Sequence, residues 1–247
     1  MTRVHKLVKR LKDAWDDIVD GVNSVLDMLP GVLEGSIKSA FEKCSSKVAK
    51  VFKEIAKLYS ERGSASALRA AGGSWNEQVG HRASTQAGLL TKEALEADDE
   101  WTGDAADRYG EAITTQGKAL TEIKAITDIL QTTLNEVASA LHVFWIGIKI
   151  AFGTYVSLMI GCIVGVASGV GTIPSLSVAL TLSVAFLGTV TKLSSDFADT
   201  LDEKKAKFEQ QSAMDGQFAN GDSPSSVAEK MADASVRDGD KSAWTPK

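Results

Sequence analysis

Residues 143–191 read VFWIGIKIAFGTYVSLMIGCIVGVASGVGTIPSLSVALTLSVAFLGTVT, and Lys149 is the one charged side chain among them. The pattern predicts two apolar helices, over 143–171 and 175–190, joined by a turn at residues 172–174. Pro174 is expected at the first helical position, where its missing N–H costs no hydrogen bond. The second helix would be about 24 Å long, against roughly 30 Å for the hydrocarbon core of a bilayer.

Small residues recur at every fourth position along the first of these helices. The repeat consists of Gly153, Ser157, Gly161, Gly165 and Gly169. Glycine in a water-exposed helix costs about 1 kcal/mol relative to alanine, whereas small residues on one ridge let two helices approach closely in lipid. The ridge therefore predicts a membrane-interacting, self-associating hairpin.

Three interpretations of the apolar hairpin stay open. It inserts into a membrane, with self-association to a pore as one outcome. It is instead the permanent core of a soluble helical scaffold or secretion chaperone, wrapped by amphipathic helices. Or it makes the chain an integral membrane protein with two spans and both charged arms on one side.

Residues 1–62 carry 12 basic and 9 acidic side chains and show apolar residues at helical spacing. They predict two amphipathic helices, separated at Leu29-Pro30-Gly31 and ended by Arg62-Gly63-Ser64. Basic residues near the N-terminus are followed by Asp13 rather than by an apolar run, so a cleaved signal peptide is not expected.

Residues 63–142 show two apolar stripes on either side of Trp101. One stripe includes Leu68, Trp75, Val79, Ala83 and Leu90, and the other alternates steps of three and four from Ala106 to Phe144. The stripes predict a long antiparallel helical hairpin with Trp101 filling its tip. Gly103 is expected in a left-handed conformation, and Asp104 as the cap of the second helix.

The run Trp101-Thr102-Gly103-Asp104-Ala105-Ala106-Asp107-Arg108-Tyr109 resembles the W-x-G family, the ESAT-type helical substrates of type VII (ESX-like) secretion. The match covers about a third of the chain, with Trp101, Gly103, Asp104 and Tyr109 as the hairpin-turn motif. The resemblance implies pairing with a second copy or another such hairpin, contact with a secretion machinery, and export without a cleaved signal peptide. The family's Y-x-x-x-D/E export signal is missing after Tyr59, Tyr109 and Tyr155.

The resulting prediction is an all-α protein of four modules: two amphipathic helices (1–62), the W-x-G hairpin (63–142), the hydrophobic hairpin (143–192) and a charged, partly disordered tail (193–247). Its three histidines, His5, His81 and His142, lie far apart in the sequence and no metal-ligand spacing surrounds them. No nucleophile motif or phosphate loop occurs, and a net charge of -5 does not favour nucleic acid. We expect no enzyme activity, no cofactor and no metal, and a secreted or membrane-associated location.

Overall fold

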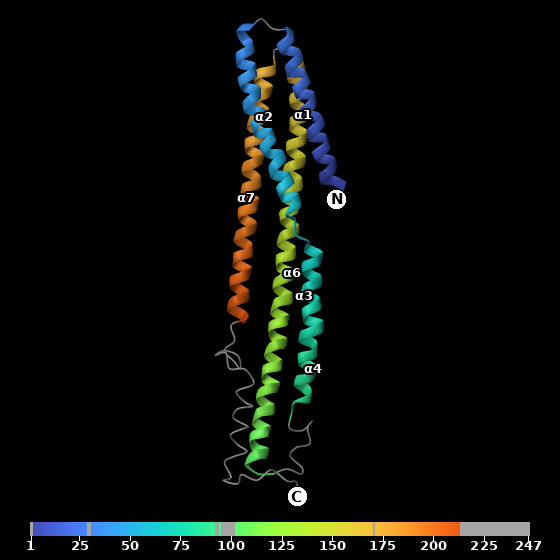
Figure 1. Ribbon diagram of the computed structural model, residues 1–247, viewed down its shortest axis with the longest axis vertical. Coiled ribbons are helices and arrows are strands. Elements are labelled where there is room, and N and C mark those ends of the chain that lie inside the picture. Colours follow the sequence, from blue (N-terminus) through green and yellow to red (C-terminus); the bar gives the residue numbers. More distant parts are fainter. Residues whose placement is uncertain (1, 29–30, 92–93, 95–101, 170, 213–247) are drawn as a thin grey trace, which may run out of the picture. The chain divides into compact units, whose positions relative to one another are not determined.

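The computed structural model describes residues 2–28, 31–91, 94, 102–169 and 171–212. Every element in these ranges is a helix, which confirms the all-α prediction. In chain order they are α1 (Thr2–Met28), α2 (Gly31–Ser60), α3 (Ala65–Trp75), the π-helix η1 (Asn76–Gly80), α4 (His81–Leu89), α6 (Asp104–Ala167) and α7 (Thr172–Ser212) (Figure 1).

Helix packing divides the chain into two units. Unit 1 contains Met1–Ser64 and Ser139–Thr200, and unit 2 contains Ala65–Ala138 with residues 201–212 among those described. The N-terminal helices, predicted as a module of their own, thus share a unit with the apolar hairpin. Helices α6 and α7 each begin in one unit and end in the other.

Unit 1 places α1 and α2 side by side with the later part of α6 and with α7 (Figure 1). The rings of Trp15 in α1 and Phe41 in α2 stack with their centroids 5.7 Å apart. Each of the four helices contributes apolar side chains to the core between them. The largest fully buried side chains of unit 1 are Leu11, Ile18, Val22, Cys44, Val48, Val51, Phe152, Val156, Met159, Val166, Thr172 and Leu176.

Contacts between α1–α2 and α6 are close. A Cβ atom placed on Gly21 of α1 would lie 2.9 Å from Cγ1 of Val166, and one placed on Gly63 would lie 3.0 Å from Leu141.

Cys44 of α2 is fully buried as a free thiol. Burial raises the pKa of the Cys44 thiol to about 11, and the nearby Cys162 of α6 adds to this rise.

Unit 2 is an antiparallel hairpin in which α3, η1 and α4 pack along the first part of α6 through small residues. A Cβ atom on Gly72 would lie 3.2 Å from the Gln131 Cα atom, and one on Gly80 would lie 3.1 Å from the Thr127 Cβ atom. Gly117 of α6 approaches the carbonyl oxygen of Leu90 in the same way. These glycines bring the two helix backbones together, and the antiparallel pairing agrees with the predicted hairpin.

The predicted stripe on the first arm of this hairpin is partly wrong. Trp75 is 53% exposed and Val79 is also exposed, whereas Gly72 and Gly80 are buried. The side chain of Asn76, at the start of η1, donates hydrogen bonds to Asp128 (2.5 Å) and Gln131 (2.6 Å) of α6. The face of this arm that contacts α6 therefore includes positions 76 and 80, one residue after the predicted positions 75 and 79.

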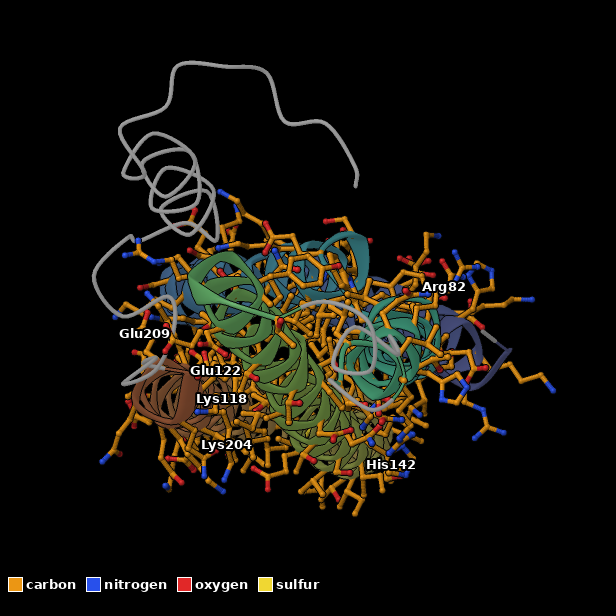
Figure 2. All side chains as sticks on the ribbon, turned by 90° about the horizontal axis from the view of Figure 1, so that it is seen from below. Arg82, Lys118, Glu122, His142, Lys204 and Glu209 are labelled. Atoms are coloured by element: carbon orange, nitrogen blue, oxygen red, sulfur yellow. The ribbon has the colours of Figure 1, made fainter. Side chains whose placement is uncertain are left out.

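Charged residues lie on the outside of unit 2. Glu136 of α6 forms ion pairs with Lys204 (3.2 Å) and Lys207 (3.7 Å) of α7, and the hydrogen bond from Lys204 lowers the pKa of Glu136. Arg82 and Lys118 are exposed, and Figure 2 labels them together with Lys204. This surface is what an ordinary water-exposed helical protein presents.

Two predicted module boundaries lie inside continuous helices. A single helix α6 runs through the expected junction at residues 142–143, because the change from charged to apolar composition brings no proline and no turn residue with it. Helix α7 continues to Ser212, so residues 193–212 of the predicted tail are helical. The rest of the tail lies outside the described residues.

Candidate membrane-contact surface

Helices α6 and α7 of unit 1 carry large apolar side chains on their outer surface as well as inside. The most exposed are Val164 (76%), Val143 (67%) and Ile150 (65%). We call the whole set the apolar belt, and it consists of Val143, Ile146, Ile150, Leu158, Ile160, Val164, Ile173, Val178 and Val184. A run of exposed large apolar residues on adjoining helices is typical of a surface that meets lipid or a partner.

Both helices are long and apolar enough to cross a membrane. Of the most apolar 18-residue window, 33% is buried in α6 and 28% in α7. The core helix of a soluble bundle would be mostly buried. Both windows are therefore more exposed than the core helix of a soluble bundle.

The chain from Ile150 to Thr191 contains no charged residue and is flanked by Lys149 and Lys192. Its α6 part, to Ala167, is about 27 Å long, and its α7 part, from Thr172, is about 30 Å long at 1.5 Å per residue. Both lengths match a hydrocarbon core of about 30 Å. The α7 arm is longer than predicted because it starts at Thr172 and passes Val190.

The two lysines lie at the same end of this hairpin, because a Cβ atom placed on Gly147 would lie 3.2 Å from the Leu193 side chain. Lys149 is exposed, and Lys192 is paired with Asp196 at 2.9 Å on the surface. Long lysine side chains can bury their carbon stems and keep the ammonium group in the headgroup layer. The pair thus marks where an inserted hairpin would leave the membrane.

Aromatic and polar contacts hold the two arms together. The buried hydroxyl groups of Tyr155 and Ser183 are 2.9 Å apart and form a hydrogen bond. The ring of Phe186 lies 5.0 Å from that of Tyr155 and 5.6 Å from that of Phe152. Phe144 stacks on Phe197 near the open end, at 5.1 Å. The sequence did not predict that Tyr155 and Ser183 pair, because the pairing depends on the register of the two arms.

The turn between the arms lies at residues 168–171, earlier than predicted. Gly169 has a φ of +72°, a left-handed conformation that glycine adopts without strain. The Thr172 hydroxyl donates to the carbonyl oxygens of Gly169 (2.8 Å) and Val166 (3.3 Å). Pro174, predicted as the turn residue at the first helical position, is the third residue of α7, where its missing N–H still costs no helical bond.

The predicted ridge divides into open and packed positions. A Cβ atom on Gly153 or Gly161 would meet nothing within 4 Å, and Ser157 between them is exposed. Gly165 instead packs against Ser175 of α7. Gly169 belongs to the turn. The part of the ridge open to a second molecule is therefore residues 153–161.

The residues of the W-x-G motif belong to unit 2 or lie outside the described residues. Trp101 is outside them. Gly103 has a φ of +109°, as expected for a left-handed residue. Its carbonyl oxygen accepts a hydrogen bond from the backbone N–H of Asp107. This bond puts Gly103 at the cap position that we assigned to Asp104, which is the first residue of α6. Tyr109 is half-buried on α6.

Among the described residues, no group of three histidine, cysteine, aspartate or glutamate side chains is placed to hold a metal ion. No family model, curated protein or solved structure matches this chain. Its function is argued below from the apolar belt.

Proposed function

We propose that this protein acts at membranes by inserting the α6–α7 hairpin of unit 1 into the bilayer. The observation that carries the proposal is the apolar belt, which is exposed on a hairpin whose arms match the thickness of a hydrocarbon core. Moving apolar surface out of water contributes about 25 cal/mol per Å² of favourable free energy, so transfer of the exposed belt from water into lipid is favourable.

Self-association in the membrane is the second part of the proposal. Apolar area does not drive helix association in lipid, whereas close approach at small residues does. Gly153, Ser157 and Gly161 lie on an open part of α6 and are free of contacts with other helices that would block such an approach. A bundle of several hairpins joined at this ridge would form a pore.

The W-x-G resemblance supports placing the protein among type VII secretion substrates. The hairpin of unit 2, with Gly103 at the start of α6, agrees with that assignment. Export would be checked by following the full-length chain in culture medium. Retention in the membrane fraction of the producing cell would instead favour the integral, two-span interpretation.

Partition of the purified protein between buffer and liposomes tests the proposal. We expect the protein to float with vesicles and to release an entrapped dye. The matched comparison uses Gly153→Leu with Gly161→Leu, which fill open positions and leave the soluble fold intact. We expect this variant to bind vesicles but to release little dye. Complete recovery of unmutated protein in the buffer would support the soluble scaffold with a permanent core.

A further inference from the structure

The α1–α2 pair covers one side of the apolar hairpin in unit 1, and its outer surface carries an uneven charge. The exposed residues Lys6, Lys9, Arg10 and Lys12 come before a run of aspartates in α1. In α2 the order is reversed, with lysines concentrated from residue 43 onward. Helices α1 and α2 run in opposite directions (Figure 1), and the stacking of Trp15 on Phe41 sets their register, so residues 6–12 lie beside the α2 residues that follow 43.

The cover therefore has a basic half and an acidic half. Residues 6–12 and 43–57 hold nine basic side chains and one acidic side chain, for +8. Residues 13–42 hold one basic and seven acidic side chains, for -6. At full charge the basic half is a strong local attractor for anions, although the whole chain is acidic.

The basic half lies at the lysine-flanked end of the apolar hairpin. Gly63, just after α2, meets Leu141 of α6, and Gly21 of α1 meets Val166 near the hairpin turn. The end of α2 therefore lies beside the part of α6 that precedes Lys149 and the uncharged segment. Residues 61–64, between α2 and α3, are not helical and form the natural hinge at this end.

The cover cannot accompany the hairpin into a bilayer. Each lysine, arginine or aspartate in the hydrocarbon core is costly, and the outer surface of α1–α2 holds many of them. When the hairpin inserts, the inner face of the cover, with Val22, Val48 and Val51, loses its partner and needs another apolar surface. An amphipathic helix with a lysine-rich polar side meets that need by lying at the boundary of headgroups and acyl chains.

We infer that the α1–α2 cover swings away from the α6–α7 hairpin at the membrane and that its basic half binds the headgroups of anionic phospholipids. This inference rests on the proposed membrane function and adds the moving part and the lipid class. The hinge at residues 61–64 keeps the basic half next to Lys149 and Lys192. All the basic groups at this end then reach one headgroup layer, while the uncharged segment crosses the core.

A disulfide between the cover and the hairpin tests the movement. A Cβ atom on Gly21 would lie 3.8 Å from the Val166 Cβ atom, which is the usual spacing in a disulfide. The variant Gly21→Cys with Val166→Cys is made in a chain whose Cys44 and Cys162 are changed to alanine. Vesicles contain phosphatidylglycerol and phosphatidylcholine in equal amounts, and the readouts are flotation and dye release.

We call this disulfide-forming variant the Gly21–Val166 lock. We expect its oxidised form to release at least about tenfold less dye than the unmutated protein. Its reduced form should release as much dye as the unmutated protein. A matched lock within the hairpin, Gly165→Cys with Ser175→Cys, joins atoms 3.2 Å apart and leaves the cover free. It should release dye whether oxidised or reduced. Equal activity of the oxidised and reduced Gly21–Val166 lock would overturn the inference and leave the proposed function standing. Failure of every reduced form to insert would overturn both.

The lipid class is tested by removing charge. Lys47→Gln, Lys50→Gln and Lys53→Gln should weaken binding to the anionic vesicles by about a hundredfold and leave binding to pure phosphatidylcholine unchanged. The control removes the same charge from unit 2 by Lys118→Gln, Lys205→Gln and Lys207→Gln. Equal weakening in both variants, or none in the first, would contradict headgroup binding by the cover.

Discussion

Helix α6 passes through two different environments along one uninterrupted run of residues. In unit 2 its outer positions include threonines and charged residues such as Glu111 and Lys118, and its buried positions are mostly small, as at Ala119. In unit 1 the inner positions are large, among them Phe152 and Met159, and the outer positions belong to the apolar belt. The backbone of α6 is helical in both units, so the two parts differ only in the polarity and size of their side chains.

If the α6–α7 hairpin of unit 1 inserts into a bilayer as proposed, the difference shows how a water-exposed hairpin and a lipid-directed hairpin can share a helix. Unit 2 gains its close packing from glycines that bring two backbones together, and it exposes polar and charged residues. Unit 1 joins its two arms through aromatic stacking and the Tyr155–Ser183 hydrogen bond, neither of which needs water as a partner. Only one side of that hairpin needs the α1–α2 cover while the protein is in water.

The largest expected effect comes from placing charge on the apolar belt. Leu158→Asp with Val184→Asp should reduce partition into vesicles at least about a thousandfold, because both residues lie near the centres of the two arms. Unfolding of the soluble protein should change little, since both side chains are about half exposed. Thr121→Asp with Thr132→Asp makes the same charge change on the unit 2 part of α6 and should leave partition unchanged. Similar losses in both variants would mean that net charge, not the belt, controls binding.

The same substitution should have opposite effects in the two units. Gly80→Ala places a Cβ atom against Thr127, which has little room to move, and should destabilise unit 2 by about 1 to 3 kcal/mol. Gly161→Ala enters open space in a helix and should stabilise unit 1 by about 0.5 to 1 kcal/mol. Urea unfolding monitored by circular dichroism measures both. A loss of stability at Gly161 would show that this position is already packed.

Alkaline pH should destabilise unit 1 through Cys44. The folded protein keeps this proton up to a pKa of about 11, whereas the unfolded thiol loses it near pH 9.0. The contribution of the neutral thiol is therefore complete below pH 9 and lost as the pH rises toward 11, by about 1 to 2 kcal/mol after allowance for solvent near the thiol. Cys44→Ala is the control for lysine and tyrosine titration in the same range. An identical pH dependence in the two proteins would exclude this cause.

A small effect is also expected at the hydrogen bond between the arms. Tyr155→Phe removes the hydroxyl that pairs with Ser183 and should cost about 1 kcal/mol in unfolding free energy. The Ser183 hydroxyl still donates to the Ala179 carbonyl oxygen at 2.8 Å, so no buried donor is left without a partner. The Ser183→Ala variant should cost a similar amount, and the double variant little more. Fully additive losses would mean that the two groups act independently.

Hydrophobic periodicity predicted the helices well because each of them has a continuous apolar face. The packing of α1–α2 on the hairpin was raised only as one of three alternatives, since it joins segments as far apart in the chain as Gly21 and Val166, which are 145 residues apart. The inward face of α3 was missed because glycines, not the large Trp75 and Val79 side chains, contact α6. The π-helix at residues 76–80 also changes the phase of the stripe, and no local sequence signal predicted it.

For the candidate membrane-contact surface, composition predicted the apolar segment and showed Lys149 as its one charged residue. Which of its residues face outward depends on where α1 and α2 pack, so the belt required the structure. The ridge shows the same division. Its spacing was evident from the sequence, but only the fold separates the open Gly153 and Gly161 from Gly165, which is packed on Ser175. The turn position likewise depended on Gly169 rather than on Pro174.

The most direct test of the account compares the depth of two positions of α6 in a vesicle-bound protein. A fluorophore sensitive to bromine is attached at Leu158→Cys or at Thr121→Cys, with Cys44 and Cys162 changed to alanine, and the lipids are brominated on their acyl chains. The account predicts strong quenching of the label at position 158 and none at position 121. Quenching at neither position in protein that floats with the vesicles would contradict insertion of the hairpin.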